Sequence, residues 1–193
     1  MFTEKFVRDK YNITEKFMTA RKANFLSFLV LLPLYIIGVV IYVSQRDYAN
    51  IFATLLKPTF LLELFILLFG IVLFIAAAML VKALLLSVFS EGKMASMKLK
   101  LISETQKPYC SLKEPIKIWQ EQFCLAVYIL IAGIAPYIVA LIIGDFLVVL
   151  ASFICMFFAG TDILFLFILF GKKRGAYVLD FDGIILYRVY EEK

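Results

Sequence analysis

The chain has 193 residues, of which 63% are hydrophobic and 18% are charged, and its formal net charge is +5. Soluble domains are roughly 45–50% apolar and about 25% charged, so this composition excludes a soluble domain. Together with a mean hydropathy of +0.94, it predicts a polytopic membrane protein. Three cysteines without a CxxC pair exclude a disulfide-rich secreted scaffold and predict free, buried thiols.

The N-terminal segment 1–23 carries too many charges for a signal peptide. Its apolar residues Phe2, Phe6, Ile13 and Phe17 have the spacing of one helix face, so we expect either an amphipathic helix on the membrane surface or a solvated leader. The apolar run 24–43 follows and is long enough for a hydrocarbon core of roughly 30 Å, which predicts the first transmembrane helix.

The second apolar run, 60–90, has 31 residues and would be about 46 Å long as a helix, so its last two turns should project beyond the membrane core. The polar segment 91–122 is predicted to be a cytoplasmic loop with a short strand at 97–102. Within that loop, Ser111-Leu-Lys-Glu114 before Pro115 has the pattern of a capping box that opens the next helix.

The third and fourth predicted transmembrane helices, 123–143 and 146–170, are joined by a tight turn at Gly144-Asp145. In the tail 171–193, two β-rich runs flank Asp182-Gly183 and predict a hairpin over 177–190. The predicted fold class is therefore an all-α polytopic membrane protein with four transmembrane helices and a small cytoplasmic β element.

Basic residues are distributed unevenly between the two sides of these predicted spans. Most Lys and Arg lie in 1–23, 91–122 and 171–193, whereas the loops on the other side hold only Arg46 and Lys57. This positive-inside pattern places both termini in the cytoplasm and predicts a multi-pass protein of the inner (cytoplasmic) membrane. It also favours the lipid bilayer, and not nucleic acid, as the partner of the basic segments.

Three ionisable residues interrupt the apolar runs, where each costs roughly 2.5–3.5 kcal/mol on insertion scales. Glu63 and Lys82 lie close to helix ends, so an interfacial position or snorkelling can explain them. Asp162 lies eight residues before Phe170, about 12 Å inside the boundary of its span. A short aspartate cannot reach the surface from there, so we expect Asp162 to face the bundle interior, to be protonated or to have a partner.

Over roughly residues 60–190 the chain resembles the zincin peptidase family, small bacterial integral membrane proteins classed as a domain of unknown function. The matching motifs are Tyr109-Cys110, Lys113-Glu114-Pro115, Ala135-Pro136, Gly160-Thr-Asp162-Ile, Gly171-Lys-Lys and the run from Val178 to Tyr187.

Members of that family carry His-Glu-x-x-His on a helix, with both histidines binding zinc, the glutamate acting as base and a later aspartate as third ligand. The matching stretch here reads Ala78-Met79-Leu80-Val81-Lys82, and the chain contains no histidine. The resemblance therefore implies a zincin-like fold, whereas the residues predict no metal, no cofactor and no catalysis. We expect Lys82 to occupy part of the space of the metal and to form a buried ion pair with Asp162.

These observations favour a catalytically inactive, protease-like membrane protein, a pseudoenzyme that binds a membrane-protein or peptide partner. Its strands at 97–102 and 177–190 could accept an extended peptide at their edge, or they could pair with each other as a cap. The alternative is an accessory or structural subunit of a membrane complex that has no peptide groove. A transporter is disfavoured because no inverted repeat is detectable in the sequence. An active protease with a different site is also disfavoured, because the chain has no histidine that could act as a base for Ser87, Cys155 or Thr161.

Overall fold

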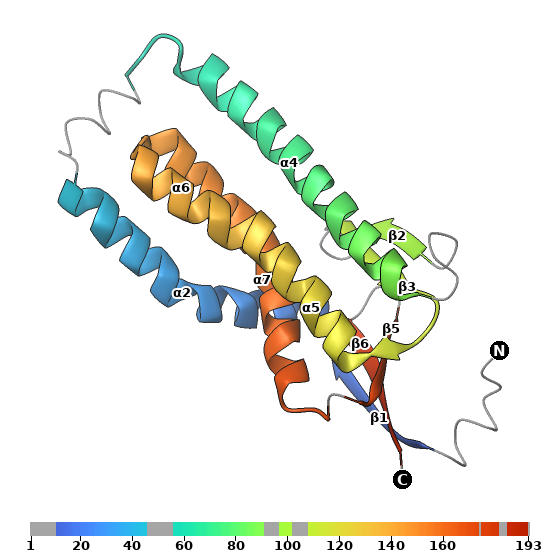
Figure 1. The fold of residues 1–193 in the computed structure, drawn as a ribbon. Coiled ribbons are helices and arrows are strands. Elements are labelled where there is room, and N and C mark those ends of the chain that lie inside the picture. Colours follow the sequence, from blue (N-terminus) through green and yellow to red (C-terminus); the bar gives the residue numbers. More distant parts are fainter. Residues whose placement is uncertain are drawn as a thin grey trace.

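The structure is a computed structural model that describes residues 11–45, 56–90, 97–101, 108–173, 175–181 and 185–192. Helices form most of this part of the chain, and short strands precede, separate and follow them (Figure 1). In chain order the elements are β1 (Tyr11–Met18), α2 (Ala20–Gln45), α4 (Phe60–Phe89), β2 (Met97–Leu101), β3 (Pro108–Leu112), β4 (Ile116–Lys117), α5 (Ile118–Ile129), η2 (Leu130–Ile134), α6 (Ala135–Ile143), α7 (Phe146–Phe170), β5 (Tyr177–Phe181) and β6 (Ile185–Glu192).

Four helical stretches of the described chain are long and apolar enough to cross a membrane. They are Arg21–Gln45, Phe60–Phe89, Ile118–Ile143 and Phe146–Phe170. The last has the predicted bounds, and α4 ends one residue before the predicted end. With 30 residues, α4 is about 45 Å long and exceeds a hydrocarbon core of roughly 30 Å. The predicted fold class, a multi-pass membrane protein with four spanning helices and a small β element, is confirmed.

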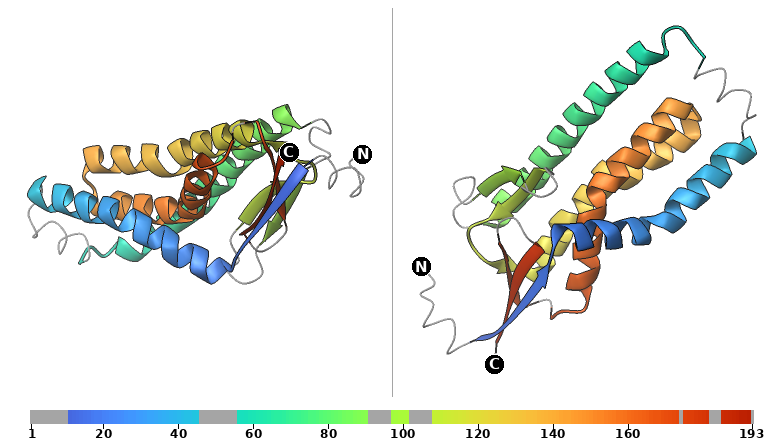
Figure 2. Two further views of the ribbon diagram at one scale, coloured as in Figure 1. Left: turned by 90° about the horizontal axis from the view of Figure 1, so that it is seen from below. Right: turned by 180° about the vertical axis from the view of Figure 1, so that it is seen from behind.

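Helix α7 is the centre of the bundle, because it packs against α2, α4 and the α5–η2–α6 span. Helices α2 and α4 lie on opposite sides of α7 and the α5–η2–α6 span (Figures 1 and 2). At Gly160 the backbone of α7 lies so close to the side chains of α2 that an added Cβ would lie 2.9 Å from Leu31 Cδ1. On α6, the Tyr137 hydroxyl donates a hydrogen bond to the Leu34 carbonyl oxygen at 2.6 Å. Small residues and interhelical hydrogen bonds therefore join α2 to the bundle, as is usual in membranes.

The third span contains a π-helical turn, η2, between two α-helical parts. Pro136 is the second residue of α6, which follows this turn. Proline lacks an N–H and its ring clashes with the carbonyl group four residues earlier, so a regular α-helix cannot pass through it without strain. The wider turn accommodates the proline and keeps the span continuous.

The strands form two antiparallel sheets at one end of the helical bundle (Figures 1 and 2). One sheet has the order β1-β6-β5-β4, and β2 pairs with β3 in the other. The predicted strand near 97–102 and the predicted C-terminal hairpin are both present, but they belong to different sheets and do not form a joint cap. Since β1 precedes the first span and pairs with β6 after the last, both ends of the described chain lie on one side of the bundle.

The predicted amphipathic helix in segment 1–23 is wrong for residues 11–18, which form strand β1. Phe2 and Phe6 lie outside the described residues, whereas Ile13 and Phe17 pair with Tyr190 and Leu186 of β6. A spacing of four residues puts two side chains on the same face of a helix and also of a strand. The periodicity therefore could not separate the two structures, and the pairing with β6 decides for the strand.

Two helix starts also differ from the prediction. Helix α2 begins at Ala20, earlier than the predicted 24, and α5 begins at Ile118, after the expected capping box at Ser111–Glu114 but before the predicted start of the span at 123. The expected capping box is wrong, because Ser111 belongs to β3. The actual start is capped by Gln120, whose Oε1 accepts a hydrogen bond from the Lys117 backbone N–H at 3.0 Å. Both helices extend beyond their apolar runs because polar residues at a helix end can lie at the membrane surface.

Candidate functional site

Lys82 of α4 and Asp162 of α7 form the ion pair that the sequence analysis expects. The Lys82 Nζ lies 2.5 Å from Asp162 Oδ1, and the two side chains are only 5% and 15% exposed. The ammonium also lies over the ring of Tyr128 in α5, 5.3 Å from the ring centroid, in a cation–π contact. One buried cation thus connects α4 to both α7 and α5.

The other residues at the family's motif positions, Ala78 and Met79, are buried on the bundle side of α4 with exposures of 3% and 8%. They belong to the main apolar core and contribute no donor that zinc would prefer, since zinc binds imidazole, thiolate and carboxylate groups. The ammonium of Lys82 has no lone pair, and it already occupies Asp162 Oδ1. The residues at this position therefore do not fit a zinc ion, and no group of three potential ligands that could hold a metal occurs in the described chain.

Glu121 is a third member of this cluster that sequence reasoning missed. It lies in the first turn of α5, is only 7% exposed and interacts electrostatically with Lys82 and Asp162. By sequence this residue belongs to the polar segment 91–122, on the helix that leads into the third span predicted to begin at residue 123. The apolar residues Ile116 and Ile118 upstream are the signal that could have extended the span to include it.

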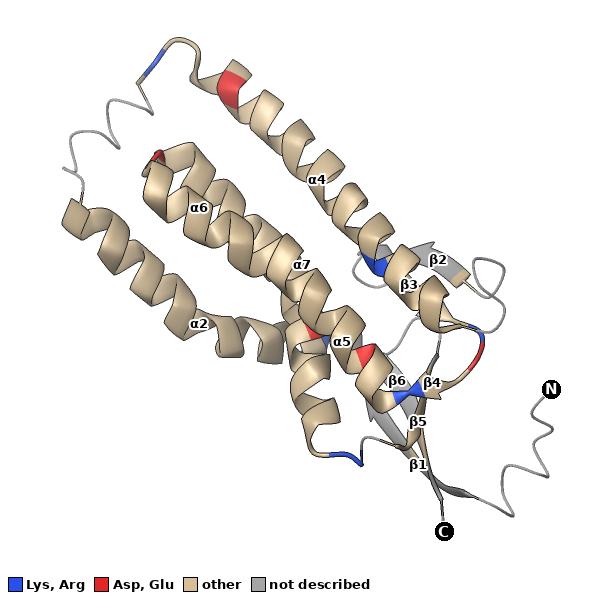
Figure 3. Cartoon of the chain, viewed as in Figure 1, with Lys and Arg blue, Asp and Glu red and all other residues tan. Residues whose placement is uncertain are grey.

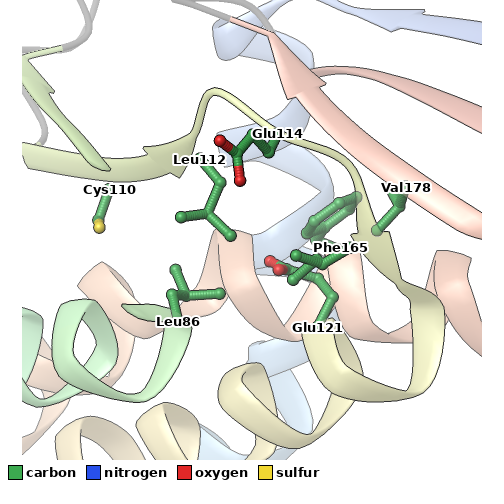
Figure 4. A pocket seen from close by; sticks show the side chains of 8 residues that line it. Leu86, Cys110, Leu112, Glu114, Glu121, Phe165 and Val178 are labelled. Carbon is green, nitrogen blue, oxygen red and sulfur yellow. The ribbon is translucent and has the colours of Figure 1, made fainter. Parts of the chain in front are cut away.

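A small pocket lies beside this cluster, where the helical bundle meets the strands. Side chains from α4, α5, α7, β3, β4 and β5 line it, and it has room for about one water molecule. Leu86, Leu112 and Phe165 supply apolar walls, and the Glu121 carboxylate is turned toward the interior (Figure 4). Glu114 lines the pocket from the connection between β3 and β4, and its Oε2 lies 3.5 Å from the Ser90 hydroxyl.

The three cysteines are free and buried, as the sequence predicts. Cys110 is the one that lines the pocket. Burial raises the pKa of the Cys110 thiol because a thiolate is poorly solvated there. A reactive cysteine needs thiolate character and access, so this environment does not activate Cys110 as a nucleophile.

Among the residues that Figure 3 colours, the charged ones outside the cluster lie mainly near the ends of the helices. Glu63, in the first turn of α4, accepts a hydrogen bond from the Thr59 hydroxyl at 2.7 Å, which agrees with the expected interfacial position. Asp145 caps α7 by accepting hydrogen bonds from the backbone N–H groups of Leu147 and Val148. Neither carboxylate belongs to the cluster of Lys82, Asp162 and Glu121.

Comparison with protein-family models, with curated proteins and with solved structures finds no match to this chain. The resemblance to zincin peptidases therefore rests on the sequence motifs. The fold and the site together define a multi-pass membrane protein with a buried charge cluster at the junction of its helices and strands.

Proposed function

We propose that this chain is a catalytically inactive, zincin-like membrane protein that binds a peptide or membrane-protein partner. One observation carries the proposal: the Lys82 ammonium is bonded to Asp162, at the position where the resemblance would place a zinc ion. An aspartate retained without its dication is costly as a buried anion, and a neighbouring lysine neutralises it. The ion pair is thus the arrangement expected of a metalloprotease-like site that has lost its metal.

The chemistry of the surrounding residues supports a non-catalytic role. A zinc protease needs a metal-activated water and a carboxylate base next to it. Ala78 and Met79 stand at the first histidine position and the base position, and both are packed into the apolar core. The Cys110 thiol, whose pKa is raised by burial, is no substitute nucleophile.

Strand β1 offers the surface on which an extended peptide could bind. It is an edge of its sheet, because β6 pairs with one side of Tyr11–Met18 and no described strand pairs with the other. Unpaired backbone groups on an edge strand can add a further strand, which is a common mode of peptide recognition. The positive-inside distribution of basic residues favours the cytoplasmic side of the inner membrane for this end of the protein.

Restoring the lost motif tests the inactive-site proposal. We expect purified wild-type protein in nanodiscs to bind no stoichiometric zinc and to leave fluorescent casein intact. The triple variant Ala78→His, Met79→Glu, Lys82→His should bind about one zinc per chain, as measured by mass spectrometry, and should lose it on Asp162→Ala. Zinc in the wild type that is lost in Asp162→Ala would refute the proposal. A folded triple variant without zinc would refute the zincin-like arrangement.

Peptide binding is tested separately, with fluorescent casein as an unfolded probe and fluorescence anisotropy as the readout. Thr14→Pro removes a backbone N–H in the middle of β1 and should weaken binding at least tenfold. Thr59→Pro is the matched control. Proline is tolerated at a helix start, and Thr59 caps the N-terminus of α4, at the end of that helix away from the strands. Equal binding by both variants, or no binding by the wild type, would contradict a peptide site on β1.

The alternative function, an accessory subunit of a membrane complex, is favoured by the first half of α4. Leu61, Phe65 and Phe69 are 76%, 70% and 60% exposed, and a Cβ added at Gly70 would meet no other described part of the protein within 4 Å. The first buried residue of the helix is Ile71. A photo-crosslinker at Phe65 should give one discrete protein adduct in cells if another subunit covers this surface. Adducts with lipid alone would contradict that function.

A further inference from the structure

Glu121 presents a buried carboxylate to the pocket, and no residue that the structure describes donates a hydrogen bond to it. The residue is 7% exposed, and it makes no hydrogen bond or ion pair with any other residue in the described part of the chain. Figure 4 shows its oxygens directed into the pocket, away from the backbone of α5. Buried polar groups in folded proteins almost always have a partner, so this carboxylate requires an explanation.

The charges around Glu121 do not supply that partner. Lys82 of α4 is the cation that faces it, but the Nζ of this lysine is bonded to Asp162 of α7. With both carboxylates ionised, the three residues would carry a net charge of −1 in a buried environment. Among the residues that the structure describes, the other titratable groups that line the pocket or interact with the cluster are Glu114, Cys110, Cys124 and Tyr128, and none of these four is basic.

We propose that Glu121 is a reversible proton-binding site, whose carboxyl group holds a proton in the folded protein and exchanges it with water in the pocket. In the exchange, the carboxyl O–H bond breaks, the proton passes to water and the carboxylate remains. One bound proton makes the cluster of Lys82, Asp162 and Glu121 electrically neutral, which removes the cost of burying an unpaired anion. The position of Glu121 in the first turn of α5 favours the anion, but the helix dipole is a smaller effect than burial.

The pocket supplies the route for the proton. It has room for about one water molecule beside the Glu121 carboxylate, and it lies at the end of the bundle where the strands begin. Proton loss creates a second anion that interacts electrostatically with Lys82, so Glu121 then competes with Asp162 for the ammonium. Protonation of one carboxyl group is thereby coupled to the contact between α4 and α7. None of these steps depends on the resemblance to zincin peptidases.

Infrared spectroscopy tests this proposal on the full chain in nanodiscs. A protonated carboxylic acid has a C=O stretching band that a carboxylate lacks and that shifts in D₂O. We expect wild-type protein at pH 7 to show this band, Glu121→Gln to lose it, and Glu63→Gln to retain it. Glu63 is the matched control, because it also lies in the first turn of a membrane helix but accepts a hydrogen bond near the surface. Raising the pH should abolish the wild-type band.

Stability measurements give a second, independent readout. Glutamine has the shape and the neutrality of a protonated glutamate, so Glu121→Gln should melt at the wild-type temperature or above it at pH 7. Unfolding exposes Glu121 to water, where a free glutamate loses its proton at about pH 4.3. From there up to the pH at which the band disappears, the melting temperature should fall with rising pH for wild type more than for Glu121→Gln, because unfolding then releases a proton; above that pH the two melting temperatures should change in parallel. A wild type without the band, a band that persists in Glu121→Gln, or a Glu121→Gln variant that melts lower would each overturn the proposal.

Discussion

Replacing Lys82 by methionine removes the cation from the buried cluster while keeping a side chain of similar length. The partner, Asp162, has a side chain only 15% exposed, and the lost ammonium lay 2.5 Å from its Oδ1. The contact over the Tyr128 ring, at 5.3 Å, disappears as well. The substitution therefore leaves an aspartate inside the bundle without the cation that neutralised it.

The expected loss of stability follows from the opposing energies of the pair. At 2.5 Å and an effective dielectric constant of about 20, the attraction between unit charges is about 7 kcal/mol. Desolvating each ion costs several kcal/mol, so the intact pair contributes little net stability, whereas half of it is strongly unfavourable. We expect Lys82→Met to lower the free energy of unfolding by about 3–5 kcal/mol. The double variant Lys82→Met, Asp162→Leu should lie within about 1 kcal/mol of wild type, because it buries neither charge.

Reversible unfolding by SDS in mixed micelles measures these differences. Trp119 is the single tryptophan of the chain and stacks edge-on against Phe89 at 5.6 Å, so its fluorescence reports the packing of α5 on α4. Glu63→Gln is the control and should change the free energy by less than about 0.5 kcal/mol. A loss below about 1 kcal/mol in Lys82→Met, or a double variant as unstable as the sum of its single variants, would refute this reasoning.

Three further predictions concern packing, capping and thiol reactivity. Gly160→Leu should lower the free energy of unfolding by about 1–3 kcal/mol, because the new side chain meets α2, whereas Gly70→Leu, which faces open space, should change it little; equal losses in SDS unfolding would contradict the packing. Asp145→Ala should cost about 1 kcal/mol by removing the cap of α7, and Asp145→Asn should restore most of it in the same assay. Because burial raises the pKa of the Cys110 thiol and blocks access, maleimide should label it only after SDS unfolding; native labelling as fast as that of a Lys113→Cys control would be inconsistent with the structure.

Local patterns in the sequence were sufficient for the membrane helices. The length of an apolar run fixes a span, because the bilayer core has a defined thickness and every backbone polar group within it must be bonded inside the helix. Helix α7 accordingly has the predicted bounds Phe146–Phe170, and α4 differs from its prediction by one residue. The same energetics singled out Asp162, since an aspartate that deep in a span requires a partner or a proton.

Helix starts and strands were less predictable where polar and apolar residues alternate. The stretch containing Ile13 and Phe17 fits a helix face and a strand face equally well, and β1 exists because β6, more than 160 residues later, pairs with it. Glu121 lies in a stretch of mixed polar and apolar residues at the very start of the third span. Its burial results from contacts with α4, α7 and the strands, and no local pattern records these.

The sequence by itself therefore determined the class of protein, the four spans and the pair of charges that needed an explanation. The tertiary structure decided which groups meet: it brought Lys82 to Asp162 across 80 residues and placed Glu121 beside them. The physical reason is that hydropathy and span length are properties of a continuous segment, whereas burial and the neutralisation of a charge depend on which segments pack together.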